Sequence, residues 1–236
     1  MDQKIRQAQK EILKIFALKP RSFALAGGTA LELFYLRHRF SFDLDFFSPK
    51  YAQAEIDALT AEFKKITKSK IRREAEFIAG NKARVSFYTM PLEGSDRPLK
   101  IDFVEDVFFA KPVIKRFSGV PVYSVENIYI QKLIAITGTH PEIDEIGRQF
   151  TQGRREGRDI FDIYTLSMKI EPLHSFLKKT SNMIQKGIVH WYQTFSRQEL
   201  KLALLDLNIY DNKFDAKQMI MYLEDEIKEF VRQALK

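Results

Sequence analysis

The chain contains no cysteine among its 236 residues. A disulfide framework, a thiolate zinc site and a cysteine nucleophile are therefore excluded, and nothing points to an oxidising compartment. Histidine is also scarce, because the four copies are too scattered along the sequence to suggest a cluster. The sequence thus offers neither a thiolate nor a histidine cluster for metal binding.

Long apolar runs are missing as well. No apolar stretch reaches the ~18 residues that a membrane span needs. The N-terminal segment MDQKIRQAQKEILKIF is charged throughout and lacks the apolar core of a signal peptide. We therefore expect a cytoplasmic globular protein with no membrane partner, and the 45% of hydrophobic residues is enough to bury a core.

Acidic residues are fewer than basic ones. The chain has 31 Asp and Glu and 38 Lys and Arg, so its net charge is +7. Such an excess favours an acidic partner, and nucleic acid is the common one. Many of the cations lie in two segments. The first contains Lys64, Lys65, Lys68, Lys70, Arg72 and Arg73, and the second contains Arg148, Arg154, Arg155 and Arg158. Each segment could be a solvated surface or could bind RNA phosphates, and both interpretations stay open.

The central stretch of the sequence is FALAGGTALELFYLRHRFSFDLDFF, residues 23–47. It predicts a short strand, a glycine turn, a helix and a second strand. Gly27 and Gly28 let the backbone approach a phosphate closely, and the first N–H groups of the following helix favour an anion. We expect Thr29 to cap that helix. The stretch therefore predicts a site for the triphosphate tail of a nucleotide.

Two aspartates follow this helix. Asp43 and Asp45 alternate with apolar residues, so a strand would project both side chains from one face. Carboxylates this close repel each other and would raise one pKa unless a cation lies between them. The usual cation in phosphate chemistry is Mg²⁺, with Mn²⁺ as the alternative, and it prefers hard oxygen ligands. We therefore predict a divalent metal beside the phosphate site.

The remaining elements are predicted from periodicity and turn residues. Segments 71–78 and 83–90 suit a hairpin with a turn at Gly80 and Asn81, and segment 99–104 suits a strand in which Lys100 and Asp102 share one face. Segment 108–123 predicts a connection with one short strand near Val120. The spacing of apolar residues predicts a helix over 53–67, and from residue 125 onward the pattern is mostly helical.

Four segments, taken in order, resemble a known family. GGTALEL, HRFSFDLDFF, KIDFV and GRDIFDIY are similar to motifs of the AbiEii/AbiGii-type toxin branch of the polymerase-beta-like nucleotidyltransferases, across about two thirds of the chain. One such motif is common by chance, but all of them in this order are not. In that family the glycine turn and the D-x-D strand hold a nucleoside triphosphate and metal, which implies these roles for Gly27, Gly28, Thr29, Asp43 and Asp45.

The resemblance implies further site residues. Asp102 in KIDFV would be the third metal carboxylate, Lys132 would face the nucleotide phosphates, and Asp159 in GRDIFDIY would belong to the active site. Arg39 and Ser41 match the family's H-R-x-S-x-D-x-D motif as a phosphate contact and a turn-stabilising hydroxyl.

Each of these assignments has a structural alternative. Asp102 could be a surface acid, Lys132 could extend its ammonium to water, and Asp159 with Asp162 could serve only the helix dipole. Arg39 could simply pair with the neighbouring aspartates.

We expect an α+β fold, in which a nucleotidyltransferase-like mixed sheet of about five strands, flanked by helices, forms a core over residues 1–123. A C-terminal helical domain, residues 124–236, would contribute Lys132 and Asp159. The implied function is metal-dependent transfer of a nucleoside monophosphate from a nucleoside triphosphate to an acceptor hydroxyl, with the 3′ end of transfer RNA as acceptor. The protein would act as the toxin of a toxin–antitoxin pair, with a cognate antitoxin as partner. The alternatives are a protein or small-molecule acceptor, and a catalytically silent module that binds nucleic acid or antitoxin.

Overall fold

The computed structural model divides the chain into two compact units. Unit 1 comprises Met1–Tyr35 and Phe40–Asn127, and unit 2 comprises Leu36–Arg39 and Ile128–Lys236. The structure describes residues 2–18, 22–68, 70–77, 83–138, 141–143, 149–151, 153–154 and 156–235. The expected turn at Gly80 and Asn81 lies outside these residues.

Unit 1 is built on a seven-stranded mixed sheet with the order β3-β4-β5-β2-β1-β7-β6. The strands are β1 (Ala24–Ala26), β2 (Leu44–Ser48), β3 (Arg72–Phe77), β4 (Val85–Met90), β5 (Leu99–Glu105), β6 (Ile114–Phe117) and β7 (Val120–Tyr123). β2 runs parallel to β5 and β1 runs parallel to β7, whereas the other neighbours are antiparallel. The α+β class with a mixed sheet is confirmed.

The expected number of about five strands is wrong, in part because segment 108–123 contains two strands. β6 and β7 pair as a hairpin through Ser118 and Gly119, whose φ angles are 48° and 86°. Two successive residues with positive φ form the tight turn that suits the twist of paired strands. Serine gives no strong signal for such a conformation, so the sequence pattern predicted only the second strand.

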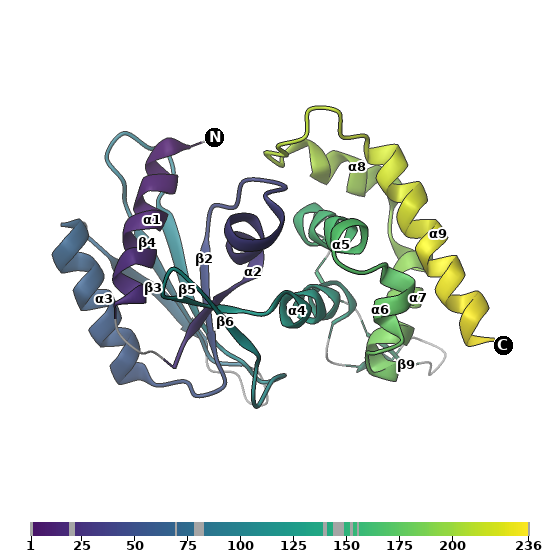
Figure 1. Cartoon of the computed structure of the whole chain (residues 1–236), viewed down its shortest axis with the longest axis horizontal. Coiled ribbons are helices and arrows are strands. Elements are labelled where there is room, and N and C mark those ends of the chain that lie inside the picture. Colours follow the sequence, from purple (N-terminus) through teal and green to yellow (C-terminus); the bar gives the residue numbers. More distant parts are fainter. Residues whose placement is uncertain are drawn as a thin grey trace. The chain divides into compact units, whose positions relative to one another are not determined.

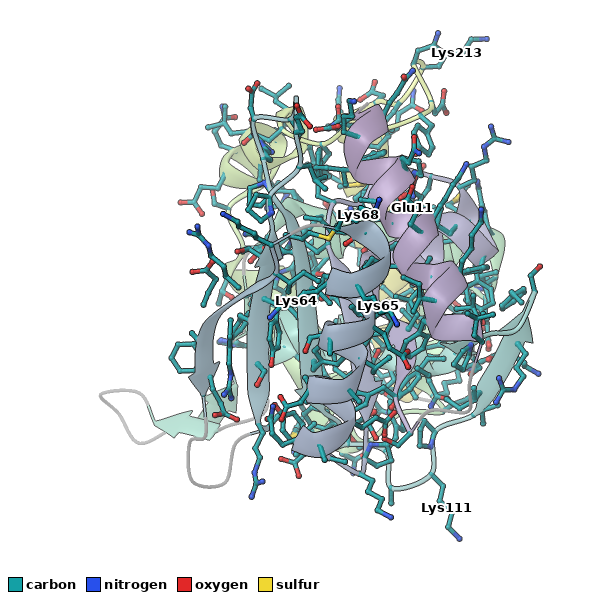
Figure 2. All side chains as sticks on the ribbon, turned by 90° about the vertical axis from the view of Figure 1, so that its left-hand side faces the viewer. Glu11, Lys64, Lys65, Lys68, Lys111 and Lys213 are labelled. Carbon is teal, nitrogen blue, oxygen red and sulfur yellow. The ribbon has the colours of Figure 1, made fainter. Side chains whose placement is uncertain are left out.

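The helices of unit 1 cover the sheet on both faces. They are α1 (Gln3–Ala17), α2 (Gly27–Ala30), which continues as the π-helix η1 (Leu31–Leu36), and α3 (Gln53–Thr67). Figure 1 shows α1 and α3 on one face of the sheet and α2 on the other, and Figure 2 shows α1 and α3 side by side in front of the sheet.

Buried aromatic rings fix the face that α1 and α3 cover. Phe46 of β2 lies 4.3 Å from the ring of Phe16 in α1 and 5.5 Å from the ring of Phe103 in β5, and all three side chains are buried. Each such ring contributes about 1.5–3 kcal/mol by leaving water. Because side chains alternate along a strand, the half-buried Asp45 points to the opposite face.

Unit 2 is mainly helical. Its helices are α4 (Val125–Thr137), whose first residues belong to unit 1, α5 (Gly157–Lys169), α6 (Leu173–Leu177), α7 (Asn182–Thr194), α8 (Arg197–Leu205) and α9 (Ala216–Ala234). α9 packs against α6, α7 and α8. The short strands β8 (Pro141–Ile143) and β9 (Gln149–Thr151) form a hairpin that the sequence analysis did not predict.

Candidate active site

Two of the three predicted metal carboxylates lie side by side in unit 1. In the parallel pair β2 and β5, Asp45 is the register partner of Asp102, and both side chains are half-buried on the face away from α1 and α3. Neighbouring strands are ~4.8 Å apart, so the two carboxylates are adjacent. Asp43 lies just before β2, which begins at Leu44, so the expected strand carries only Asp45 of the D-x-D pair.

The glycine turn lies directly against Asp45. Ala26 is the antiparallel register partner of Asp45, and Gly27 follows it with a φ of 67°. A Cβ at Gly27 would overlap Oδ2 of Asp45 and lie 3.0 Å from Cγ. Glycine is therefore required at this position both by its backbone conformation and by the closeness of the carboxylate.

We expect Gly27→Ala to displace the Asp45 carboxylate and to lower the free energy of unfolding by more than the about 1–2 kcal/mol of a left-handed alanine. Gly94→Ala is the matched control, because Gly94 has a φ of 73° but a Cβ there would meet only Cε of Lys4 at 3.7 Å. Thermal unfolding of both variants measures the difference. Equal losses would show that Asp45 does not press on Gly27.

Thr29 does not cap the helix as expected. The cap residue is Ala26 without a side-chain hydrogen bond, so Thr29 lies inside the first turn. Its buried hydroxyl donates to the backbone carbonyl of Asp43. Its one hydrogen is used in that bond, and the role that the resemblance implies for Thr29 toward the triphosphate stays a prediction. Gly28 is buried too, and Gly27 is the glycine of the pair that reaches solvent.

A buried network that the sequence analysis missed holds the segment before β2. The N–H of Ser41 donates to Oε2 of Glu32 at 2.8 Å, and Nε2 of Gln9 donates to the carbonyl of Ser41 at 2.9 Å. Glu32 also forms an ion pair with Arg6 of α1. A glutamate inside the apolar run LELF was the available signal, since a buried acid needs a partner. Ser41 is thus fixed through its backbone.

The donor chemistry of this face fits a hard divalent cation, because Asp43, Asp45 and Asp102 offer only carboxylate oxygens. Register places Asp45 and Asp102 together. In the part of the chain that the structure describes, however, no three His, Cys, Asp or Glu side chains are gathered as a ready metal site. The three-carboxylate site therefore stays a prediction.

The other predicted residues meet in unit 2, in a buried cluster of charges. Nζ of Lys132 lies 2.6 Å from Oδ1 of Asp159 and 2.9 Å from Oδ2 of Asp162. Both aspartates are 0% exposed and the Lys132 side chain is 9% exposed, so the structure does not support the alternative in which its ammonium extends to water. The two acids are three residues apart on α5 and therefore share one face. They do more than serve the helix dipole.

Arg39 joins the same cluster. Its Nε and Nη2 donate to the two oxygens of Asp162, each at 2.7 Å. Nε2 of His38 lies 2.7 Å from Oδ1 of Asp162, and the ring of His38 stacks on Phe161. The sequence analysis assigned no role to His38 and considered Asp162 only as a partner of Asp159 at the helix dipole, although their three-residue spacing could have pointed to a shared site.

A family model covers nearly the whole chain. Residues 12–233 match the family model described as nucleotidyl transferase AbiEii toxin of a type IV toxin–antitoxin system. The chain belongs to the AbiEii family. A search of curated proteins gave no match.

Two solved structures share the fold of this AbiEii-family chain. A candidate nucleotidyltransferase from H. pylori is 18% identical with a TM-score of 0.61, and the similarity covers 99% of this chain and 98% of that one. JHP933 from Helicobacter pylori is also 18% identical with a TM-score of 0.61, over 99% and 96% of the two chains. The expected family and the expected nucleotidyltransferase fold are confirmed. No helix in the described ranges is both long and apolar enough to cross a membrane.

The charges of the buried cluster in this AbiEii-family chain compensate one another. Burial alone would raise the pKa of Asp162, but Arg39, Lys132 and His38 hold it well below the ordinary value of 3.8. Burial would lower the pKa of Lys132, yet Asp159 and Asp162 raise it above 10.5. For His38, burial lowers the pKa more than Asp162 raises it, so the pKa falls below 6.5. His38 is therefore neutral at pH 7, whereas the other members are charged.

This arrangement predicts acid sensitivity below pH 6.5. Because the pKa of His38 is lower in the folded than in the unfolded chain, protonation favours unfolding, and stability falls as pH drops below 6.5. We expect a loss of up to about 1.4 kcal/mol for each pH unit in that window. His38→Gln keeps a donor to Asp162 and should flatten the dependence of thermal unfolding on pH, with His190→Gln as control. An unchanged slope would contradict the assignment. Below pH 3.8 the loss of the Asp162 charge adds to both curves.

The basic segments are partly neutralised. Lys64 and Lys65 of α3, with Lys68 after it, are exposed on the outer side of α3 (Figure 2), on the sheet face opposite to Asp45. Arg73 pairs with Glu76. In the second segment Arg154 lies 3.1 Å from Asp159 and Arg158 pairs with Glu156. Arg148 and Arg155 lie outside the described residues.

Proposed function

We propose that the chain is a metal-dependent nucleotidyltransferase that moves a nucleoside monophosphate from a nucleoside triphosphate to an RNA hydroxyl, the 3′ end of transfer RNA. It would act in the cytoplasm as the toxin of a toxin–antitoxin pair. The carrying observation is that Asp45 and Asp102 are register partners on one sheet face, with the glycine turn against Asp45. Membership of the AbiEii family supports the reaction class and an antitoxin as partner.

Residues of unit 1 would bind the triphosphate and the metal. The backbone N–H groups at the start of α2, from Gly27 onward, would hold the β- and γ-phosphates. Asp43, Asp45 and Asp102 would hold Mg²⁺ or Mn²⁺. When bound, the cation would neutralise phosphate charge and lower the pKa of the acceptor hydroxyl. Positioning the hydroxyl in line with the α-phosphorus is then the main contribution of the protein.

The roles implied for Arg39, Lys132 and Asp159 toward the nucleotide stay predictions. In this structure the ammonium of Lys132 is bound by Asp159 and Asp162, and the guanidinium of Arg39 by Asp162. Phosphate binding by either cation would have to add to these ion pairs or replace one of them.

The acceptor is tested by incubating the protein with each α-labelled nucleoside triphosphate and Mg²⁺, and adding either total RNA or RNA-free soluble protein. We expect label to enter RNA, to disappear with a chelator and to return with added Mg²⁺. Label in protein or in a small molecule alone would exclude RNA as the acceptor. No transfer with Mg²⁺ or Mn²⁺ would exclude the nucleotidyltransferase proposal itself.

A further inference from the structure

The sheet face that carries Asp45 and Asp102 continues across β4 to the edge strand β3. On this face, register aligns residues of β5, β4 and β3 in three rows across the strands. In that strand order, the rows are Asp102, Phe87 and Ala75, then Val104, Val85 and Phe77, and then Lys100, Thr89 and Arg72. The residues between them, such as Tyr88 and Ser86, are buried toward the other face. The surface beyond the acids therefore mixes aromatic, aliphatic and cationic side chains.

Two aromatic rings lead away from the acids. Phe87 is half-buried and is the register partner of Asp102, so its ring starts one strand away from the carboxylate. Phe77 is 60% exposed, and its ring centroid lies 5.7 Å from that of Phe87, nearly perpendicular to it. Edge strands commonly carry charged residues that prevent unwanted pairing, as the rest of β3 does. A largely exposed phenylalanine at this edge is therefore unusual, and we take it as an indication that a ligand binds there.

Cations border the rings. Lys100 and Arg72 are both exposed and occupy the two ends of the row that contains Thr89. Glu74 also lies beside this row, since the Thr89 hydroxyl donates to it. Aromatic rings for nucleobases and cations for phosphates are the combination that binds single-stranded nucleic acid without sequence preference.

We propose that Phe77, Phe87, Lys100 and Arg72 form a platform for the single-stranded end of the acceptor RNA. Bases stack on Phe87 and Phe77, and the phosphates lie against Lys100 and Arg72. The inference rests on the proposed function, because the platform begins one strand from Asp102 and so delivers the terminal hydroxyl to the acids. The charge of Lys100 and Arg72 favours a phosphate chain over a neutral or basic peptide.

The test measures binding of a fluorescent single-stranded RNA of about 12 nucleotides by anisotropy. Phe77→Leu and Phe87→Leu keep an apolar side chain but remove the aromatic face, and each should weaken binding by about tenfold. Phe77→Tyr and Phe87→Tyr should bind as the parent does. Phe108→Leu is the matched control, because Phe108 is 46% exposed but lies beyond β5, outside the platform.

Charge is tested in the same assay. Lys100→Gln should weaken binding and lower the slope of log affinity against log salt by about 1, as expected for one lost phosphate contact. Lys111→Gln is the control, since Lys111 is exposed and points away from the body of unit 1 in Figure 2. Equal effects of Lys100→Gln and Lys111→Gln would reduce the platform to general charge attraction and overturn it.

Transfer kinetics separate this inference from the proposed function. The leucine variants should raise KM for acceptor RNA and leave KM for the nucleoside triphosphate unchanged. If the parent labels RNA while the leucine variants bind and react like it, the platform is wrong and the enzyme proposal stands. If the parent labels no RNA, RNA is excluded as the acceptor, and the anisotropy series alone decides whether the platform binds RNA. Should Phe87→Leu fail to fold, the exposed Phe77 carries the test.

Discussion

Asp45→Asn is expected to lower nucleotidyl transfer by about a thousandfold or more, because removing one metal carboxylate forfeits several kcal/mol of transition-state stabilisation. The change keeps the shape of the side chain beside Gly27 and removes one of two adjacent negative charges. Because asparagine has the same shape as aspartate, we expect the variant still to unfold in one cooperative thermal transition while activity is lost.

Asp96→Asn is the matched control, because Asp96 is an exposed aspartate in the turn before β5. It should leave both transfer and thermal unfolding unchanged. Expression in cells gives a second measurement, since family membership predicts a growth defect with the parent chain that Asp45→Asn abolishes. A growth defect that survives Asp45→Asn, with transfer already lost in vitro, would mean that the toxic effect does not depend on catalysis.

Lys132→Met is expected to lower the free energy of unfolding by about 3–5 kcal/mol, because breaking a buried ion pair leaves uncompensated charge. Methionine preserves much of the side-chain length. Asp162 would still have Arg39 and His38. Among the described residues, Asp159 would keep only the ion pair with Arg154, whose side chain is 53% exposed. Thermal unfolding followed by circular dichroism should show a fall of about 10 °C in the midpoint.

Two further variants make the result specific. Lys178→Met removes an exposed lysine of the same unit and should change little. The double variant Lys132→Met/Asp159→Asn removes the unpaired charge along with its partner, so it should be more stable than Lys132→Met alone. If Lys132→Met unfolds like the parent chain but loses transfer, the ammonium is not held by the two aspartates in solution and its role is directed at the nucleotide.

Local features of the chain were predictable because they depend on near neighbours in sequence. The spacing of apolar residues predicted helix Gln53–Thr67 with its observed bounds, and alternation placed Lys100 and Asp102 on one face of a strand. Motif order correctly predicted the family and the mixed α+β fold. The hairpin of β6 and β7 was not predicted, because its turn contains a serine at positive φ and residue type does not indicate that conformation.

The partners of the polar residues were much harder to predict. Thr29 suited a helix cap by residue type, yet the helix begins at Gly27, two residues before it. Its hydroxyl bonds to the carbonyl of Asp43, just before strand β2. Arg39 stands four residues from Asp43, but its guanidinium binds Asp162, more than a hundred residues away. Residue type sets which bonds a side chain can form, whereas the fold sets which partner is within reach.

The order of glycines, acids and helices along the chain was sufficient to determine the family, the fold class and the carboxylates worth testing. Tertiary structure alone decided that Asp45 and Asp102 are register partners, that Phe77 and Phe87 continue their face, and that Lys132 is bound by two buried aspartates. The reason is physical, because strand register and side-chain pairing arise from packing between segments that are distant in sequence.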